Sequence, residues 1–265
     1  MIAKHFNAVS MCPWGAFALG DSPELVCHCM VVETKHGLVL VDCGLWADAD
    51  AERARPPRPF LALTRCAFDH DATAARGVER LGYRASDVRH VVCTHLDLDH
   101  AGGISDFPDA EIHVMEDERA AAIARRTANE RRRYVRAHFA HEPKWRTHEA
   151  NGETWKGFSA VRALAADEPD LLLVPLPGHT RGHAAVAVRT AAGWLLHCGD
   201  AYFHHEEMTS HARAPFGLEL FQRTMAVDDD QRRQNQRRLR ELKAGHGDVR
   251  LFCAHSKREL EGDMT

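Results

Sequence analysis

Short apolar runs, separated by glycine, proline and charged residues, recur along most of the chain. Short runs rich in valine and leucine are typical of buried β-strands. The runs at 26–32 and 38–42 are joined by Lys35-His36-Gly37, so they predict an antiparallel hairpin with glycine at the bend. Further strands are predicted at 88–93, 111–115, 171–174, 184–188, 194–197 and 249–253.

Helical patterns and loops lie between these runs. The pattern predicts a helix over 71–81 that ends at Gly82, a long arginine-rich helix from 116 to about 141, and a last helix from 228 to about 243. The proline-rich segment 46–71 is predicted to be a loop. The segment 143–170 contains three aromatic residues among glycine and charged residues, which suggests a small hairpin or cap; they are Trp145, Trp155 and Phe158.

The order of these elements predicts the fold class. Strands followed by helices in each half indicate two packed sheets with helices outside them. There is no sharp change of composition, long linker or tandem repeat, so we expect a single domain over residues 1–265.

Composition narrows the class of partner and the compartment. The 34 basic and 38 acidic residues give a net charge of −4, which does not favour a nucleic-acid-binding protein. The arginine runs at 125–126, 131–133 and 232–238 are therefore interpreted as solvated helix faces. Eight cysteines without disulfide-like spacing, no targeting segment and no membrane-length apolar run predict a cytoplasmic protein with reduced thiols.

The segment Thr94-His-Leu-Asp-Leu-Asp-His-Ala-Gly-Gly103 is the densest group of metal-ligating residues in the chain. It directly follows the predicted strand 88–93. Because strand side chains alternate, His95 and Asp97 should point the same way at the end of that strand. Asp99 and His100 follow at a turn where a helix could begin, and their side chains diverge enough to bind a second ion. We interpret the segment as a metal site.

Other predicted strands also end in metal-ligating residues. Asp42-Cys-Gly44 ends the hairpin, and three later strands lead into Pro177-Gly-His-Thr180, Cys198-Gly-Asp200 and Ala254-His-Ser256. A single histidine at a strand end is usually structural, but the repetition favours a shared metal site. The candidate metal ligands are therefore His95, Asp97, Asp99, His100, His179, Asp200 and His255.

In their order and spacing, these motifs resemble the metallo-β-lactamase superfamily of hydrolases, whose pattern is His-x-His-x-Asp-His, then Gly-His, a bridging Asp and a final His. The resemblance extends over nearly the whole chain and implies an α+β fold, the four-layer αββα sandwich. It also implies that His95, position 97 and His179 hold a first ion. Asp99, His100 and His255 would hold a second, with Asp200 bridging the two.

Within the superfamily the chain is most similar to the lactonase and glyoxalase II-like branch, through Val41-Asp42-Cys-Gly44, Thr94-His95 and 177–183. Two positions depart from the pattern. Phe203 stands where those lactonases have a substrate-contacting tyrosine, and Asp97 stands where the superfamily usually has its second histidine. An added oxygen ligand favours harder ions, so the expected cofactors are two divalent ions chosen from Zn, Fe or Mn.

The site that the resemblance implies predicts hydrolysis of a small-molecule ester, lactone or thioester by a metal-bound hydroxide. Asp99 would take part directly, and Asp42 would accept a hydrogen bond from a ligand histidine. His183 could do the same or simply begin the next strand. Tyr202 and His204, which with His205 follow the bridging aspartate, are candidate proton donors to the leaving group.

Three alternatives remain open at this point. Asp97 also fits a non-haem iron redox or sulfur-oxidising enzyme, and the arginine runs fit a phosphodiesterase. A metal-binding protein without turnover would carry the same ligands. Cys27 and Cys29, although close to His28, are interpreted as buried core residues because no further motif completes a zinc site. The oligomeric state cannot be predicted.

Overall fold

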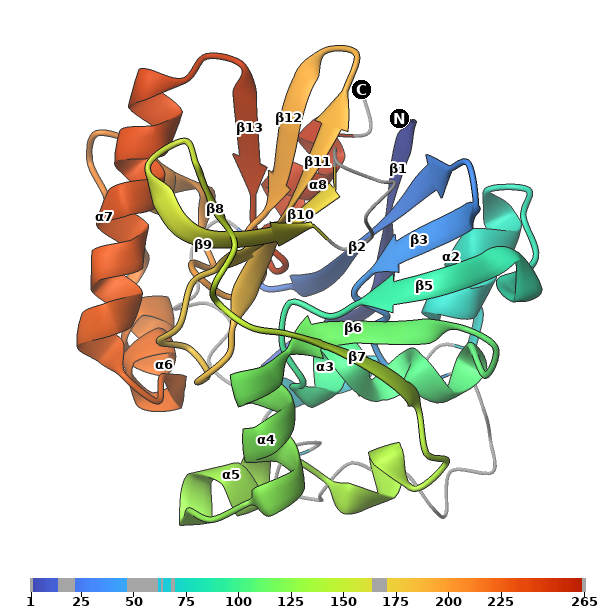
Figure 1. Cartoon of the computed structure of the whole chain (residues 1–265). Coiled ribbons are helices and arrows are strands. Elements are labelled where there is room, and N and C mark those ends of the chain that lie inside the picture. Colours follow the sequence, from blue (N-terminus) through green and yellow to red (C-terminus); the bar gives the residue numbers. More distant parts are fainter. Residues whose placement is uncertain are drawn as a thin grey trace.

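The computed structural model describes residues 2–13, 22–46, 62, 64–67, 70–163 and 171–263. Two sheets face each other across an apolar layer, to which both contribute (Figure 1). The seven-stranded sheet has the order β4 (Cys66–Ala67), β1 (Ala3–Met11), β2 (Leu25–Thr34), β3 (Gly37–Val41), β5 (Val88–Val92), β6 (Glu111–Met115), β7 (Lys144–His148). The six-stranded sheet has the order β13 (Val249–Phe252), β12 (Gly193–His197), β11 (Ala184–Thr190), β10 (Leu171–Pro175), β9 (Phe158–Ala163), β8 (Glu153–Trp155).

Helices cover the outer faces of both sheets. The first sheet packs against α2 (Ala74–Arg80) and α4 (Glu116–Ala124) in one apolar cluster, and the second packs against α7 (Asp229–Gly245) in another. This arrangement confirms the predicted αββα sandwich. The remaining helices are α3 (Leu98–Ala101), α5 (Ala128–Arg133), α6 (Phe216–Met225) and α8 (Lys257–Asp263), with 3-10 turns η2 (His70–Ala72), η3 (Ala85–Asp87), η4 (Gly102–Asp106), η5 (Arg136–Phe139) and η6 (His205–Met208).

Strand pairing brings distant motifs to one edge of the sandwich. β3 and β5 are parallel, with Val41 opposite Val92, so the residues that follow both strands meet at the same edge. β12 and β13 are also parallel, with His197 opposite Phe252. The segments after these four strands contain Asp42, the residues from Thr94 onward, Asp200 and His255.

Most predicted strands are confirmed, but the long helix predicted from 116 to about 141 is wrong. The α4 helix ends at Ala124 because Arg125 adopts a left-handed conformation, with φ of 46°. A new helix, α5, then starts after Thr127, whose side chain caps it together with Glu130. Because of this break, the arginine side chains at 131–133 point in other directions than they would on one continuous helix.

Of the two predictions for the segment 143–170, a small hairpin or a cap, the structure shows a hairpin, and the described residues join the two sheets. Residues Lys144–His148 form β7 at the edge of the first sheet, and Glu153–Trp155 and Phe158–Ala163 form a hairpin at the edge of the second. Residues 164–170, and most of the predicted loop 46–71, lie outside the described residues. In the described part of the chain, no helix combines the length and the apolar character needed to cross a bilayer.

Candidate metal centre

Asp200 lies between two groups of candidate ligands. Its Oδ1 is 3.1 Å from the Nε2 atoms of both His100 and His255. Its Oδ2 is 3.3 Å from His179 Nε2 and 3.8 Å from His95 Nε2. Each oxygen of one carboxylate therefore faces a different set of histidines, which is the geometry that a bridging ligand requires.

The first donor group consists of His95, Asp97 and His179. The Asp97 Oδ2 atom is 3.4 Å from His95 Nε2 and 3.1 Å from His179 Nε2, and one ligand atom from each residue lies within 4.8 Å of the others. All three side chains are buried or nearly so. Asp97 also begins α3 as its N-cap residue, so the strand end and the helix start fix its position together.

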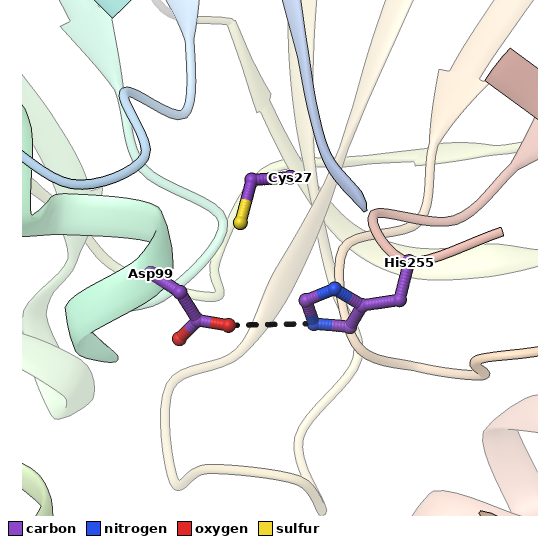
Figure 2. Close-up of side chains that lie close together, drawn as sticks. All are labelled: Cys27, Asp99 and His255. Carbon is purple, nitrogen blue, oxygen red and sulfur yellow. Dashed lines mark ion pairs between the residues drawn. The ribbon is translucent and has the colours of Figure 1, made fainter. Parts of the chain in front are cut away.

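The second donor group consists of Asp99, His100 and His255. The Asp99 Oδ2 atom is 3.8 Å from His100 Nε2 and 3.6 Å from His255 Nε2. In Figure 2 the sulfur of Cys27, on β2, points toward the space between the Asp99 carboxylate and the His255 ring, and the three ligand atoms lie within 4.8 Å of one another. Cys27 was interpreted as a core residue, and it is buried, but it also contributes a sulfur to this group.

Other hydrogen bonds turn the two histidines of the second donor group toward the centre. His100 Nδ1 donates to Asp42 Oδ2 at 2.8 Å, and His255 Nδ1 donates to the Val26 carbonyl at 2.8 Å. Asp42 is itself held by the backbone and hydroxyl of Thr94, at 2.7 and 2.8 Å. The Nε2 atoms are thereby left for a ligand, as in metal sites where an outer carboxylate or carbonyl orients the histidine.

His183 holds the bridging residue from behind. Its Nδ1 donates to the Leu176 carbonyl at 3.1 Å, so its Nε2 is free to accept the backbone N–H of Asp200 at 2.9 Å. Burial lowers the pKa of His183 well below its usual value, which keeps Nε2 an acceptor. Of the two roles left open for His183, the structure supports an orienting one, directed at the Asp200 backbone.

Charge and unsatisfied atoms in the donor groups fit divalent cations. Burial alone would lower the pKa of His100 and His255, but the carboxylates of Asp200 and Asp99 outweigh it and raise both. Among the described residues, buried polar atoms that make no hydrogen bond include His95 Nε2, His100 Nε2 and Asp200 Oδ1. Buried groups of this kind are expensive unless a ligand completes them. A metal ion between acidic and imidazole ligands would do so.

Comparison with known proteins decides the family. The model of the metallo-beta-lactamase superfamily matches residues 22–255, which contain all the candidate ligands. The chain belongs to the metallo-β-lactamase superfamily. This confirms the predicted family, fold and enzyme class, a metal-dependent hydrolase.

The chain is also similar to individual relatives and to solved structures. A probable metallo-hydrolase from Mycobacterium bovis is 45% identical over 252 residues, which are 95% of this chain and 79% of the relative. An N-acyl homoserine lactonase from Bacillus thuringiensis is 24% identical over 193 residues, or 72% of this chain and 70% of the relative. The solved structure of an N-acyl homoserine lactone hydrolase with bound product shares the fold, with a TM-score of 0.73, 20% identity and coverage of 98% and 95%.

The Asp97 position, unusual for the superfamily, has a partner that the sequence interpretation missed. Arg133 was assigned to a solvated helix face, but its side chain is only 3% exposed. Its NH1 atom donates to Asp97 Oδ2 at 2.6 Å and lies 3.1 Å from His179 Nε2. Burial alone would raise the pKa of Asp97, but Arg133, together with His95 and His179, outweighs it and holds that pKa well below its usual range. Because Arg133 already balances the charge of Asp97, this carboxylate does not by itself favour a harder metal.

Glu118 is a second residue that the motifs did not reveal. It is fully buried on α4, and its Oε1 accepts the N–H of Leu96 and the hydroxyl of Tyr134, both at 2.9 Å. Its Oε2 accepts the N–H of Gly182 at 3.1 Å. Glu118 therefore ties the loop with His95 and Asp97 to the loop with His179. Only its position, in the first turn of a helix next to the motif strands, could have suggested this role.

The proposed proton donor Tyr202 is not directed at the centre. It is fully buried in the core under α7, and its hydroxyl donates to Glu259 at 3.0 Å. The role proposed for Tyr202 is therefore corrected to a structural one. His204 caps η6 by accepting the N–H of Glu206. The aromatic side chain at the centre is instead Phe203, whose ring lies 4.7 Å from the His255 ring and 6.0 Å from the His179 ring.

Proposed function

We propose that this chain hydrolyses a small ester, lactone or thioester, using divalent ions bound by the two donor groups. The observation that carries the proposal is the convergence of four histidines, His95, His100, His179 and His255, on the two oxygens of the Asp200 carboxylate. The similarity to a named lactonase over 72% of the chain favours a cyclic or open ester as substrate. Zinc is the favoured metal, because another structural neighbour is a dizinc lactonase, at a TM-score of 0.60 and 15% identity.

In this proposal His95, Asp97, His179 and Asp200 surround one ion, and Asp99, His100, His255 and Asp200 surround the other. Divalent ions in such a site polarise a carbonyl and lower the pKa of water toward neutrality. The protein contributes the fixed positions: Asp42 orients His100, Val26 orients His255 and His183 orients Asp200.

The surroundings of the centre support an acyl substrate more than a charged one. The Phe203 ring lies beside those of His255 and His179 and is only 3% exposed, because it packs with Cys27 and Leu218 in a small apolar cluster. An acyl or alkyl group of a substrate that reached the ions would meet the edge of this cluster. Because Phe203 has no hydroxyl, a substrate carbonyl would have to be oriented by the ions rather than by this side chain.

We also propose that the protein works in the cytoplasm. All eight cysteines lie among the described residues and none forms a disulfide, and six of them are buried. Thiols in this state fit a reducing compartment.

A metal-by-substrate panel tests the function. Protein purified without chelators is first analysed for metal and then depleted and reloaded with Zn²⁺, Mn²⁺ or Fe²⁺. Each form is assayed on an N-acyl homoserine lactone, an aryl ester and an acyl thioester. We expect turnover of at least one substrate, lost on chelation and restored by one of the ions.

Two variants serve as controls for the panel. Asp200→Ala should lose both metal and turnover, whereas His36→Ala, in the exposed turn between β2 and β3, should keep both. Less than one ion per chain as isolated, with no turnover gained on reloading, would overturn the proposed function.

A further inference from the structure

We propose that Arg133 occupies the position of the first ion, so that the two donor groups bind metal in order, the second group first. The inference rests on the proposed metal centre but not on any substrate. Its basis is the place of one guanidinium nitrogen: NH1 contacts both Asp97 Oδ2 and His179 Nε2, at 2.6 and 3.1 Å. These are the same two atoms that face His95 and Asp200 and would bind an ion.

The guanidinium and an ion cannot share this position. Zinc binds imidazole nitrogen and carboxylate oxygen at about 2.0–2.2 Å. An ion ligated by Asp97 Oδ2 and His179 Nε2 would therefore overlap NH1, which already lies within hydrogen-bond distance of both. The His179 lone pair is also the same one that NH1 approaches. The first ion must displace NH1 before it binds.

Arg133 is held firmly enough for this displacement to be costly. Its NH2 donates to the Met225 carbonyl at the end of α6, so α5 and α6 both fix the guanidinium. The side chain is 3% exposed and its ion-pair partner Asp97 is 11% exposed. The ion would replace Arg133 as the partner of Asp97, but the hydrogen bond from the guanidinium to Met225 would be lost. A hydrogen bond of a charged group contributes about 1.5–3 kcal/mol, which corresponds to about 10- to 100-fold in affinity.

The second donor group lacks such a competitor. Among the described residues, no lysine or arginine forms an ion pair with Asp99 or Asp200; their charged neighbours within the centre are histidines. An ion there would meet the Nε2 atoms of His100 and His255, whose rings are already oriented by Asp42 and Val26. Cys27 adds a sulfur within reach of Asp99 and His255 (Figure 2).

The consequence is a centre in which one ion and one guanidinium share the space of two ions. With only the second group filled, Arg133 keeps its positive charge beside Asp97 and His179, about where the first ion's charge would be. Filling the first group requires Arg133 to leave. The Asp97 carboxylate, unusual for the superfamily, then has a clear purpose, because a histidine at this position would not anchor a guanidinium.

A metal-binding isotherm tests this directly, without substrate. Metal-free protein is loaded with Zn²⁺ in competition with a chromophoric chelator. The wild type should bind one ion per chain tightly and a second about 10- to 100-fold more weakly. Arg133→Met should tighten the weaker step by about tenfold or more while changing the tight step little.

Arg132→Met is the matched control, because Arg132 is the exposed neighbour on the same helix and should leave both steps unchanged. Arg133→Gln repeats the test in case the methionine variant does not fold, and the wild-type isotherm alone already decides between one tight step and two. Two equally tight steps in the wild type, or an unchanged weaker step in both Arg133 variants, would overturn the inference. If no ion binds tightly to the wild type, the proposed function fails as well.

Discussion

The two donor groups share Asp200, yet their carboxylates are balanced in different ways. In the second group, Asp99 faces the histidines His100 and His255. In the first, Asp97 faces a permanent cation, Arg133, which contacts the ligand atoms themselves. Histidines yield their protons to a metal ion, whereas an arginine stays charged and must move away. At the same edge of the sandwich, the second donor group is therefore open to an ion, whereas the Arg133 guanidinium already lies at the first.

The histidines on the two sides respond to this difference. Burial lowers the pKa of His179 to about 4, even though Asp200 opposes the shift, and Arg133 contributes to the lowering. Burial acts in the same direction on His100 and His255, but carboxylates outweigh it and raise their pKa values. Carboxylates thus favour a charged imidazole at His100 and His255, whereas burial and Arg133 favour a neutral imidazole at His179.

The difference in metal affinity between the two donor groups can be tested by removing one histidine from each group. His255→Ala should weaken the tight binding step by more than about 100-fold, because removing a hydrogen-bond partner behind a metal ligand already costs up to about that much in affinity. His179→Ala should leave the tight ion nearly intact and abolish the weak one. Metal content after dialysis, combined with a Zn²⁺ isotherm, measures both effects. If His179→Ala removes the tight ion and His255→Ala spares it, the order of filling is reversed.

The second prediction concerns the carboxylate behind the first group. Glu118→Ala leaves the N–H groups of Leu96 and Gly182 buried without an acceptor, and each such loss costs about 1–3 kcal/mol. We expect the free energy of unfolding to fall by about 3 kcal/mol, measured by urea denaturation at neutral pH. The weaker metal step should also weaken more than the tight one, because Glu118 joins the two loops of the first group.

Asp117→Ala provides the control, since Asp117 is the exposed neighbour in the same helical turn. Its loss should change stability by less than about 1 kcal/mol. Equal effects of the two substitutions would show that Glu118 acts only through the helix and does not hold the loops.

The positions of the candidate ligands could be predicted because they depend on strand ends. Once β3, β5, β12 and β13 are recognised, parallel pairing brings the residues that follow them to one edge, and the motif order supplies the rest. Arg133 could not be predicted, because its direction depends on the left-handed Arg125 that breaks the expected long helix. The aspartate at position 97, where the superfamily usually has a histidine, was the one signal in the sequence that a buried cation could lie nearby.

Residues with long-range hydrogen bonds were equally out of reach. Glu118 acts across 64 positions to Gly182, and no local pattern marks such a contact. Tyr202 was misassigned because its place in the sequence, two residues after Asp200, suggested exposure to the centre. The chain turns there so that Phe203 faces the histidines and Tyr202 enters the core.

The third and smallest effect lies behind the second group, where Glu259 on α8 accepts the Cys253 N–H at 2.9 Å and the Tyr202 hydroxyl at 3.0 Å. Burial raises the pKa of Glu259 from 4.5 to about 7, despite these two donors. Between those pH values the unfolded chain releases a proton that the folded chain keeps, so the free energy of unfolding falls as the pH rises.

The Glu259→Gln side chain cannot lose a proton. We therefore expect its stability relative to the wild type to increase by about 1–2 kcal/mol between pH 5 and pH 7, measured by urea denaturation at both values. The exposed Glu261→Gln on the same helix should show no such trend. A constant difference in stability between Glu259→Gln and the wild type would mean that Glu259 is ionised at both pH values. The Cys253 N–H and the Tyr202 hydroxyl would then donate to a carboxylate that is always charged.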